Sequence, residues 1–471
     1  MISFIKTKSG LLVTVSIAIL ALIGYHYGYF FPWPDVETIV SVRQPELKAE
    51  LVAEGLSFPT TMAFLGPNDI LVLEKNNGTV QRILNGNMLV DPVLDVNVAN
   101  KYERGMLGVA VLPNKAPQQH EERGLANINT TNATSTTATH VFLYFTEIDR
   151  EGSDVCAKPD YCSSQQKPFG NRIYSYEWDN STGKLVNPVL ILDLPADSVP
   201  IHNGGKLVIG PDNNIYFTIG DLNHRSATQN FPKRTAYNET GGIYRITQDG
   251  RAVQPILGNE HPIDKYYAYG IRNSYGIDFD PVTGKLWDTE NGPAFGDEIN
   301  LVEPGFNSGW RKVQGIWNVT EITAPGGRLN LTDLDNKAIG LDPKGLETFG
   351  GRGSYSSPEF TWFNSTAPTA VVFLNSEKLG KQYQNDMFVA GYKQGYIYHF
   401  KLNQNRTALL LKGPLNDKVS DSSAELEAII FGEGFGAITD IQVGPYDGYL
   451  YVVSSGAKGV INRIVPASES S

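Results

Sequence analysis

A loose internal repeat is the feature that most constrains how this chain can fold. Each unit contains an apolar strand, a tight turn with Pro, Asp, Asn or Gly, and a second strand rich in Ile, Leu, Tyr and Val. Pro-Asp and Asp-Gly pairs at fixed offsets supply the turn through which the two strands can pair. Clear copies start at Met62, Leu207, Ile277 and Ile441, and weaker copies lie near residues 106–178 and 386–402.

Many units continue into a third strand that ends in Arg and Ile, as in Val80–Ile83, Ile243–Ile246 and Ile461–Ile464. Sheets repeated around an axis form a propeller, which leaves no long unprotected edge. The content of Gly (47) and Pro (27) also suits a protein with many tight turns. The sequence therefore predicts an all-β fold, a six-bladed β-propeller over residues 51–466, preceded by an N-terminal transmembrane helix.

The predicted transmembrane helix is a membrane anchor. Lys6 and Lys8 precede an apolar and aromatic run over residues 11–31. As a helix, that run would be about 32 Å long, which is enough to cross a bilayer. The leading lysines would keep the N-terminus inside and place the body on the extracytoplasmic side. We therefore expect the anchor within residues 1–33 and a connector over residues 34–50. A cleaved signal peptide is the alternative, and it would export the body equally.

Three further features bear on compartment and partners. Cys156 and Cys162 flank a short polar loop and could form a local disulfide, stay a free pair, or form a weak metal site. Nine Asn-x-Ser/Thr triplets give mild support for a glycosylated exterior. The formal net charge is −11, and the acidic residues are dispersed with no basic stripe. This argues against a nucleic-acid partner, because phosphates require clustered Lys and Arg.

The first candidate site pairs a histidine with an aspartate. His202 to Gly205 stand just before the first strand of one clear repeat, and Asp221 follows its second strand, so both lie at the same end of the predicted sheet. A carboxylate orients an imidazole and stabilises its protonated form, so His202 could act as a general base. Two adjacent glycines let the backbone approach a ligand closely. The alternative is a turn histidine and a turn aspartate without chemistry.

Three other loops contain groups that could bind a ligand. Arg272, within Gly270–Gly276, could bind a carboxylate through two hydrogen bonds or form a structural ion pair. The loop Glu290–Asn300 concentrates carbonyls and carboxylates, which suits Ca²⁺ but also an ordinary polar loop. Lys393, between two predicted strands, could contact an anion or a quinone, or simply be solvated.

These stretches resemble the PQQ-dependent soluble glucose and aldose sugar dehydrogenases, also called glucose/sorbosone dehydrogenases. The resemblance covers nearly the whole predicted propeller and is densest in His202–Asp221, Gly270–Gly276 and Glu290–Asn300. It implies a six-bladed propeller with PQQ over the channel mouth and Ca²⁺ bound to the cofactor. It also implies oxidation of an aldose sugar at C1 to the lactone, with electrons passed to an external acceptor.

The resemblance also implies roles for individual residues. His202 would remove the proton from the C1 hydroxyl, and Asp221 would orient it. Arg272 would lie with Asn273 near the quinone oxygens. The other implied positions are Lys393, Asn291, Asp297 and Glu103 near cofactor or substrate, the carbonyls of Gly292 and Pro293 at the cofactor's Ca²⁺, Glu298 at a second, structural Ca²⁺, and Trp362 lining the pocket.

The sequence departs from the family pattern in the last repeat. The family usually has Arg-x-Arg-Asp there, and this chain has Ala437-Ile438-Thr439-Asp440. PQQ carries three carboxylates, and each charged hydrogen bond lost costs about 1.5–3 kcal/mol. Asn291 also stands where His or Gln is more usual. These departures make a non-catalytic extracellular binding module the alternative function, ahead of a Ca²⁺-dependent propeller lactonase.

Overall fold

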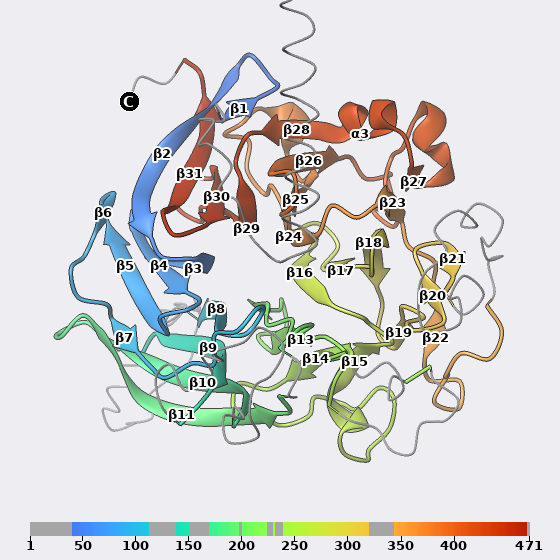
Figure 1. Ribbon diagram of the computed structural model, residues 1–471, viewed down its shortest axis with the longest axis horizontal. Helices are drawn as coiled ribbons and strands as arrows, with labels where there is room; N and C mark the ends of the chain where they lie inside the picture. The colour runs from blue at the N-terminus through green and yellow to red at the C-terminus, as the bar shows by residue number, and fades with distance from the viewer. Residues whose placement is uncertain are drawn as a thin grey trace, which may run out of the picture. The chain divides into compact units, whose positions relative to one another are not determined.

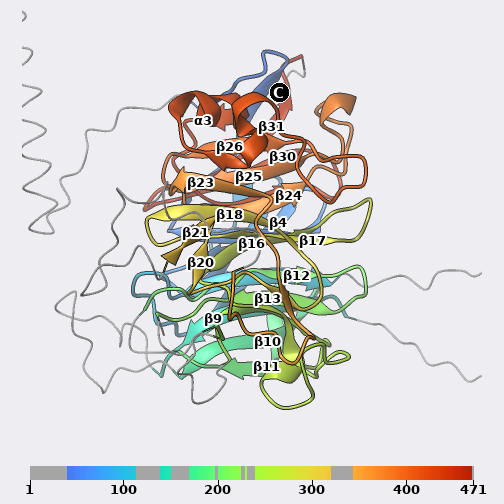
Figure 2. The ribbon, with the colours of Figure 1, turned by 90° about the vertical axis from the view of Figure 1, so that its right-hand side faces the viewer.

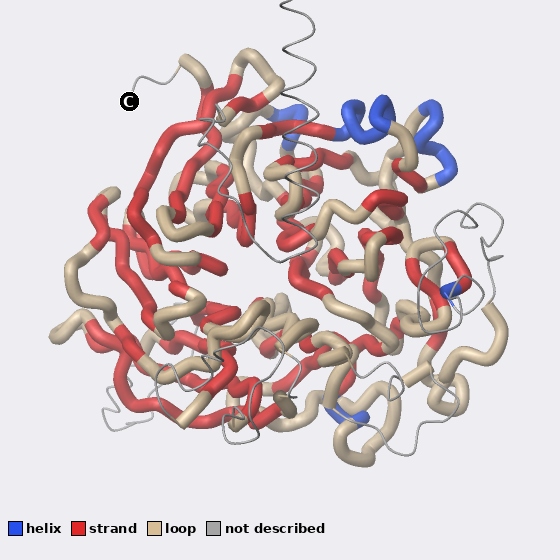
Figure 3. Tube along the Cα trace, viewed as in Figure 1, coloured by secondary structure: helices blue, strands red, loops and turns tan. Residues whose placement is uncertain are grey.

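The computed structural model describes residues 40–112, 138–149, 169–196, 200–223, 229–230, 239–319 and 343–468. These residues belong to a unit that spans Val40–Ser471. Most of their regular structure is antiparallel β-sheet, and the sheets are arranged around a central axis (Figure 1). Figure 3 shows strands throughout the ring, with the short helical turns toward its outer side.

Six sheets contain four or more strands. Each sheet is named after its innermost strand, which is called its first strand below. The β3 sheet contains β3 (Pro59–Gly66), β4 (Asp69–Glu74), β5 (Thr79–Leu84), β6 (Asn87–Met88) and β7 (Leu94–Asp95), which pairs with β5. The β8 sheet contains β8 (Met106–Leu112), β9 (His140–Glu147), β10 (Gly170–Asp179) and β11 (Lys184–Leu194). The β12 sheet contains β12 (Leu207–Ile209), β13 (Ile215–Ile219), β14 (Gly242–Ile246), β15 (Tyr266–Tyr269), β19 (Phe306–Asn307) and β22 (Ser354–Tyr355).

The remaining sheets complete the ring. The β16 sheet contains β16 (Ser274–Phe279), β17 (Leu286–Glu290), β18 (Phe295–Val302), β23 (Phe360–Asn364) and β27 (Val419–Ser420). The β24 sheet contains β24 (Pro368–Phe373), β25 (Met387–Gly391), β26 (Tyr396–Phe400), β28 (Ile430–Glu433) and β1 (Ser41–Val42). The β29 sheet contains β29 (Ala437–Val443), β30 (Leu450–Ser455), β31 (Gly459–Pro466) and β2 (Leu47–Leu56). A separate pair joins β20 (Val313–Gln314) and β21 (Trp317–Asn318), helix α3 spans Ser423–Ile429, and 3-10 turns span Ile263–Lys265, Lys381–Tyr383 and Gly413–Asp417.

The first strands form the inner wall of the ring. Strand β3 contacts β8, and contacts then follow in order through β12, β16, β24 and β29 back to β3. Seen from the side, strands of successive sheets lie one above another, from β11 and β10 to β26 (Figure 2). Because each first strand starts at the same end of the ring, the residues that precede these strands meet around one opening.

The hydrophobic core lies between neighbouring sheets. Successive side chains of a strand point to opposite faces of its sheet. In β4, Leu71 therefore packs into the core shared with the β8 sheet, while Val72 packs into the core shared with the β29 sheet. Strands buried on both faces are nearly continuous in apolar residues, which is why β4 reads Asp-Ile-Leu-Val-Leu-Glu.

The ring is closed by strands from distant parts of the sequence. Strand β2 pairs antiparallel with β31 in the β29 sheet. Arg463 on β31 donates to Glu50 on β2 over 3.3 Å, although 413 residues separate them in sequence. Residues 41–42 and 47–50, within the predicted connector 34–50, thus already belong to sheets.

The predicted fold class, an all-β six-bladed propeller with a transmembrane helix, needs correction. Within the described ranges, no helix is long and apolar enough to cross a membrane, so the anchor is not supported. The predicted membrane-anchored localisation is not supported for the same reason. The three-strand repeat also does not describe a set of equal blades, because the sheets hold between four and six strands. Their outer strands lack the turn pattern and come from connections of different lengths.

Several sequence predictions lie outside the described residues. They are the anchor over 1–33, the Cys156–Cys162 pair, and the triplets at Asn129, Asn132, Asn238 and Asn330. Asn77, Asn180, Asn364 and Asn405 are exposed, and glycosylation at these positions stays a prediction.

Candidate active site

One cavity of about 550 Å³ opens where the first strands begin. Its lining includes residues that precede or follow strands of several sheets, among them Phe58, Glu103, His202, Arg272 and Lys393. Of the predicted site residues, Asn273, Asn291, Gly292 and Pro293 also line it. Residues distant in sequence are thus brought together around one pocket.

The His202 loop has an unusual backbone. His202, Gly204 and Gly205 have φ angles of 59°, 60° and 109°, in or near the left-handed region. A Cβ at Gly204 would lie 2.8 Å from the Thr218 carbonyl oxygen, and one at Gly205 would lie 2.6 Å from Leu107 Cβ. The two glycines are therefore required. His202 carries a Cβ, so its left-handed backbone conformation costs about 1–2 kcal/mol, which other contacts must offset.

Asp221 holds the His202 imidazole. The distance between His202 Nδ1 and Asp221 Oδ1 is 2.5 Å. Asp221 also accepts from Trp310 Nε1 at 2.8 Å and from the Asn223 N–H at 2.8 Å. Burial opposes ionisation of Asp221, but the hydrogen bond from His202 and the other donors outweigh it and lower its pKa. Asp221 is therefore a carboxylate, and His202 Nε2 is the ring nitrogen left for chemistry.

Arg272 and Asn273 lie on the loop before β16. The Arg272 N–H donates to Glu290 Oε1 at 2.6 Å, and its Nη1 donates to the Asn291 carbonyl at 2.8 Å. The guanidinium lies over the Trp310 ring, 5.5 Å from its centroid. Burial lowers the pKa of Arg272, against the opposing effect of Asp221 and Glu103. Arg272 thus places a cation on the pocket wall beside the His202–Asp221 pair.

Asp297 organises the predicted calcium loop without lining the pocket. Its carboxylate accepts from the Gly292 N–H at 2.8 Å and from the Thr366 and Ala367 N–H groups at 2.6 and 2.8 Å. A Cβ at Gly292 would lie 2.0 Å from the Phe295 carbonyl oxygen, so only glycine fits. Burial raises the pKa of Asp297, against these hydrogen bonds. Its contacts hold the loop rather than a ligand.

Glu103 links three site residues through one oxygen. Its Oε2 accepts from the His202 N–H at 2.6 Å, from Tyr275 Oη at 2.6 Å and from Asn273 Nδ2 at 3.2 Å. Burial, followed by the neighbouring Glu103 charge, raises the pKa of Tyr275 well above its usual value, so Tyr275 stays a donor. Glu103 therefore joins the two loops that carry His202 and Asn273.

The predicted second-calcium residue Glu298 lies away from the pocket. It accepts from Gln314 Nε2 at 2.9 Å, Asn300 Nδ2 at 3.0 Å and the Gly315 N–H. Burial raises its pKa to about 8 and raises that of Glu290 well above its usual value. Ser308 Oγ lies within hydrogen-bond distance of one oxygen of each carboxyl group. In the described residues, no group of three or more His, Cys, Asp or Glu side chains is arranged to hold a metal ion.

Of the two departures from the family pattern in the last repeat, Ala437 and Thr439, Thr439 lies at this pocket. Thr439 lines the pocket, and its hydroxyl donates to the Pro59 carbonyl at 3.0 Å. Asp440, next to it, is fully buried and pairs with Lys206 Nζ at 2.6 Å. Its other oxygen accepts from Thr61 Oγ1 at 2.7 Å. A buried ion pair between the β12 and β29 sheets therefore lies at the pocket wall, where Lys206 is one of the lining residues.

Sequence reasoning missed several residues of this site. Trp310, Tyr275 and Glu290 contact predicted site residues directly, and Lys206 pairs with Asp440. Tyr275 and Glu290 lie inside quoted motifs, but Trp310 and Lys206 have no local signal because their partners are far away in the chain. Trp362 does not line the pocket, since it is buried in the core against Phe360 and Tyr398.

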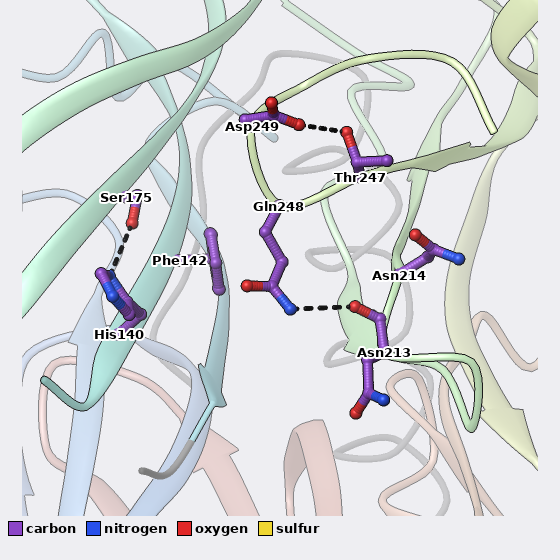
Figure 4. Close-up of a pocket in the computed structure, with 8 residues that line it drawn as sticks. All are labelled: His140, Phe142, Ser175, Asn213, Asn214, Thr247, Gln248 and Asp249. Atoms are coloured by element: carbon purple, nitrogen blue, oxygen red, sulfur yellow. Dashed lines mark hydrogen bonds between the residues drawn. The ribbon is translucent and has the colours of Figure 1, made fainter. Parts of the chain in front are cut away.

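A second cavity, of about 450 Å³, lies at the opposite end of the β8 and β12 sheets. Figure 4 shows Gln248 in its centre, with His140 and Ser175 on one side and Asn213 on the other. Its polar groups largely bond to one another, as in Gln248 Nε2 to the Asn213 carbonyl at 3.1 Å and Ser175 Oγ to His140 Nδ1 at 3.4 Å. None of the predicted site residues lines it.

Comparison with curated proteins identifies relatives over most of the chain. The chain is 23% identical over 424 residues to the aldose sugar dehydrogenase YliI of Escherichia coli, covering 89% of this chain and 93% of the relative. It is 27% identical over 286 residues to quinoprotein glucose dehydrogenase B of Acinetobacter calcoaceticus, covering 51% of this chain and 59% of the relative.

Solved structures share the fold. The apo form of the soluble aldose sugar dehydrogenase from E. coli has a TM-score of 0.63 and 22% identity, over 89% of this chain and 99% of that one. The PQQ-bound aldose sugar dehydrogenase from Streptomyces coelicolor has a TM-score of 0.57 and 20% identity, with the same coverage.

The family assignment comes from the sequence itself. Residues 56–325 and 343–463 match the family described as Glucose / Sorbosone dehydrogenase. These two ranges cover well over half of the chain and include every residue of the pocket described above. The chain belongs to the Glucose / Sorbosone dehydrogenase family, which confirms the resemblance seen in its motifs.

Proposed function

We propose that this protein is a PQQ-dependent aldose dehydrogenase that oxidises the C1 hydroxyl of a sugar to the lactone. The observation that carries the proposal is the 2.5 Å contact between His202 Nδ1 and Asp221 Oδ1 at the wall of a large pocket. With the Nδ1 proton donated to Asp221, the Nε2 lone pair is available to take a proton.

The pocket suits an anionic cofactor. Four cationic side chains line it, Lys75, Lys206, Arg272 and Lys393, against the single carboxylate of Glu103. Asn273 Oδ1 is also buried without a hydrogen-bond partner among the described residues, so a polar group of the wall is left for a ligand. Arg272, Asn273 and Lys393 would hold the cofactor, and the carbonyls of Gly292 and Pro293 would hold its Ca²⁺.

The chain's own residues would handle the proton and the orientation of the sugar. When bound, PQQ would supply an acceptor for the hydride that leaves C1 with its electron pair. His202 Nε2 takes the C1 hydroxyl proton as the carbonyl of the lactone forms. Asp221 stabilises the resulting imidazolium, and Arg272 keeps positive charge beside the pocket. An external acceptor then removes the electrons.

A binding module is the second candidate. It is favoured by Ala437 and Thr439, which leave the pocket without the two arginines usual in the family. The Thr439 hydroxyl instead donates a hydrogen bond to the backbone carbonyl of Pro59. Such a protein would bind a ligand in the same pocket without turnover.

Reconstitution separates the two candidates. The full chain is loaded with PQQ and Ca²⁺, and aldose-dependent reduction of a dye is followed beside His202→Ala. We expect activity in the parent and a loss of about 10²-fold or more in the variant. PQQ binding, followed by fluorescence titration, is the second readout. No PQQ binding would favour the binding module, whereas binding without turnover on a broad panel of aldoses would reject the substrate class.

A further inference from the structure

The loop before β8 is fastened to the His202 loop at two points. The Glu103 N–H donates to the Pro200 carbonyl at 3.2 Å, and the His202 N–H donates back to Glu103 Oε2 at 2.6 Å. The second bond is short and charge-assisted, which makes it stronger than a bond to a neutral acceptor. It acts on the one non-glycine residue of the His202 loop that has a left-handed backbone.

The Glu103 loop is in turn held by the half-buried ammonium group of Lys75. Lys75 Nζ donates to the carbonyls of Asn100, Tyr102 and Arg104, at 3.1, 2.9 and 3.1 Å. An ammonium has three donors, and these carbonyls lie on both sides of Glu103. Gly105 lets the chain pass this close, because a Cβ there would lie 2.2 Å from the Lys75 carbonyl oxygen. Lys75 thus fixes the backbone that presents Glu103.

We propose that Glu103 and Lys75 are positioning residues for the base. Glu103 fixes the left-handed backbone of His202 and couples it to Asn273 and Tyr275, and Lys75 acts through the Glu103 loop. Neither residue exchanges a proton with the substrate in this role. The inference rests on the proposed function for its kinetic consequences, but its structural content does not depend on turnover.

The geometry makes the acceptor oxygen the essential feature of Glu103. All three bonds fall on Oε2, while no donor of the described residues bonds to Oε1. The amide oxygen of Gln could accept the same three bonds, whereas Ala offers none. Glu103→Gln should therefore rescue what Glu103→Ala loses, which a general loss of packing would not do.

Two measurements on the cofactor-free full chain test the proposal. Hydrogen exchange of the peptide that contains His202 should be at least about tenfold faster in Glu103→Ala, and nearer to the parent in Glu103→Gln. The His202 imidazole titration, identified by NMR from its absence in His202→Ala, should shift in Glu103→Ala and less in Lys75→Met. Asp221 contacts this imidazole, Glu103 accepts from the His202 N–H, Arg272 interacts with Asp221, and Lys75, Lys206 and Lys393 line the same pocket, so the shift reports the placement of the ring among these charges.

Kinetics on the loaded enzyme supply the third readout. We expect kcat to fall about 10- to 100-fold in Glu103→Ala with a much smaller change in KM, and the pH profile of kcat/KM to move with the NMR titration. Lys75→Met should have a weaker effect of the same kind, and Lys75→Arg should restore part of it.

The matched controls are Glu359→Ala and Lys418→Met. These residues form a partly exposed ion pair at 2.9 Å that does not line the pocket. Unchanged exchange and titration in Glu103→Ala would overturn the proposal, as would equal damage from Gln and Ala. If the loaded parent shows no turnover, the proposed function fails, and the exchange and NMR results still decide the positioning role.

Discussion

Asp221 and Asp288 are equally buried, yet the protein treats them in opposite ways. Asp221 follows the second strand of the β12 sheet, and Asp288 lies on the second strand of the β16 sheet. Asp221 accepts from His202, Trp310 and a backbone N–H, and its pKa is lowered despite burial. Neither oxygen of Asp288 has a well-formed hydrogen bond among the described residues. Burial raises its pKa to about 7, against a smaller opposing effect of Asn300 and Ser274.

The difference shows that burial alone does not decide whether a carboxylate carries charge, but donors do not always outweigh burial, since Asp297 and Glu298 accept several hydrogen bonds and still have raised pKa values. Asp440 is also buried and has Lys206, Thr61 and the Met62 N–H as donors. Asp221 and Asp440 lie beside the pocket, whereas Asp288 lies inside a sheet.

The largest effect should come from Asp221→Asn. The amide cannot stabilise the imidazolium and favours the wrong ring tautomer, so kcat should fall about 10²- to 10⁴-fold. Dye-coupled turnover with a saturating aldose measures this. Asp288→Asn is the control, and it should keep activity within about threefold of the parent. Comparable losses in both variants would mean that burial alone explains Asp221.

Lys206→Met should have the next largest effect, on stability. It removes one member of a buried pair and leaves Asp440 charged and unpaired, which typically costs about 3–5 kcal/mol of unfolding free energy. Urea denaturation of the full chain measures the loss. Lys418→Met, which breaks the more exposed pair with Glu359, should cost no more than about 1 kcal/mol. A small change in Lys206→Met would show that the pair contributes little.

The third effect, which is the smallest per unit of pH, should be a pH dependence that Asp288 introduces. Its pKa is about 7 in the folded protein and near 3.9 in the unfolded chain. Between these values only the unfolded chain ionises, so stability falls as pH rises from about 4 to 7, by at most about 1.4 kcal/mol per unit. Denaturation midpoints are measured at several pH values with a chelator present, and their slope against pH between about 4 and 7 should be flatter in Asp288→Asn than in the parent. Equal slopes in the two proteins would contradict the raised pKa of Asp288.

The sequence predicts local features of this molecule better than long-range ones. The Pro-Asp and Asp-Gly turns predict the hairpins that open the sheets, because each hairpin is specified within a dozen residues. The outer strands were not predicted, since β2, β19 and β27 are placed by packing and carry no turn pattern. The membrane anchor predicted from the apolar run over residues 11–31 lies outside the described residues, and no helix among them is long and apolar enough to cross a membrane.

In the candidate site, too, the contacts between residues close in sequence were predicted and those between distant residues were not. The sequence predicted the contact of His202 with Asp221, because both flank strands of one hairpin unit. It could not predict Trp310 as a donor to Asp221, 89 residues away, or Lys206 as the partner of Asp440, 234 residues away. Their partners are known only once the sheets have closed into a ring, so no spacing rule finds them.

Because the ring is closed by the pairing of β2 with β31, it cannot be completed until the end of the chain has been translated. The strand that begins at Leu47 is made early, but its partner in the β29 sheet leaves the ribosome more than 400 residues later, as the 413-residue separation of Glu50 and Arg463 shows. Until then, the edge of β2 is unpaired, and the wall of the pocket near Thr439 does not exist. A nascent chain of this protein must therefore keep an open sheet edge from pairing elsewhere for most of its translation.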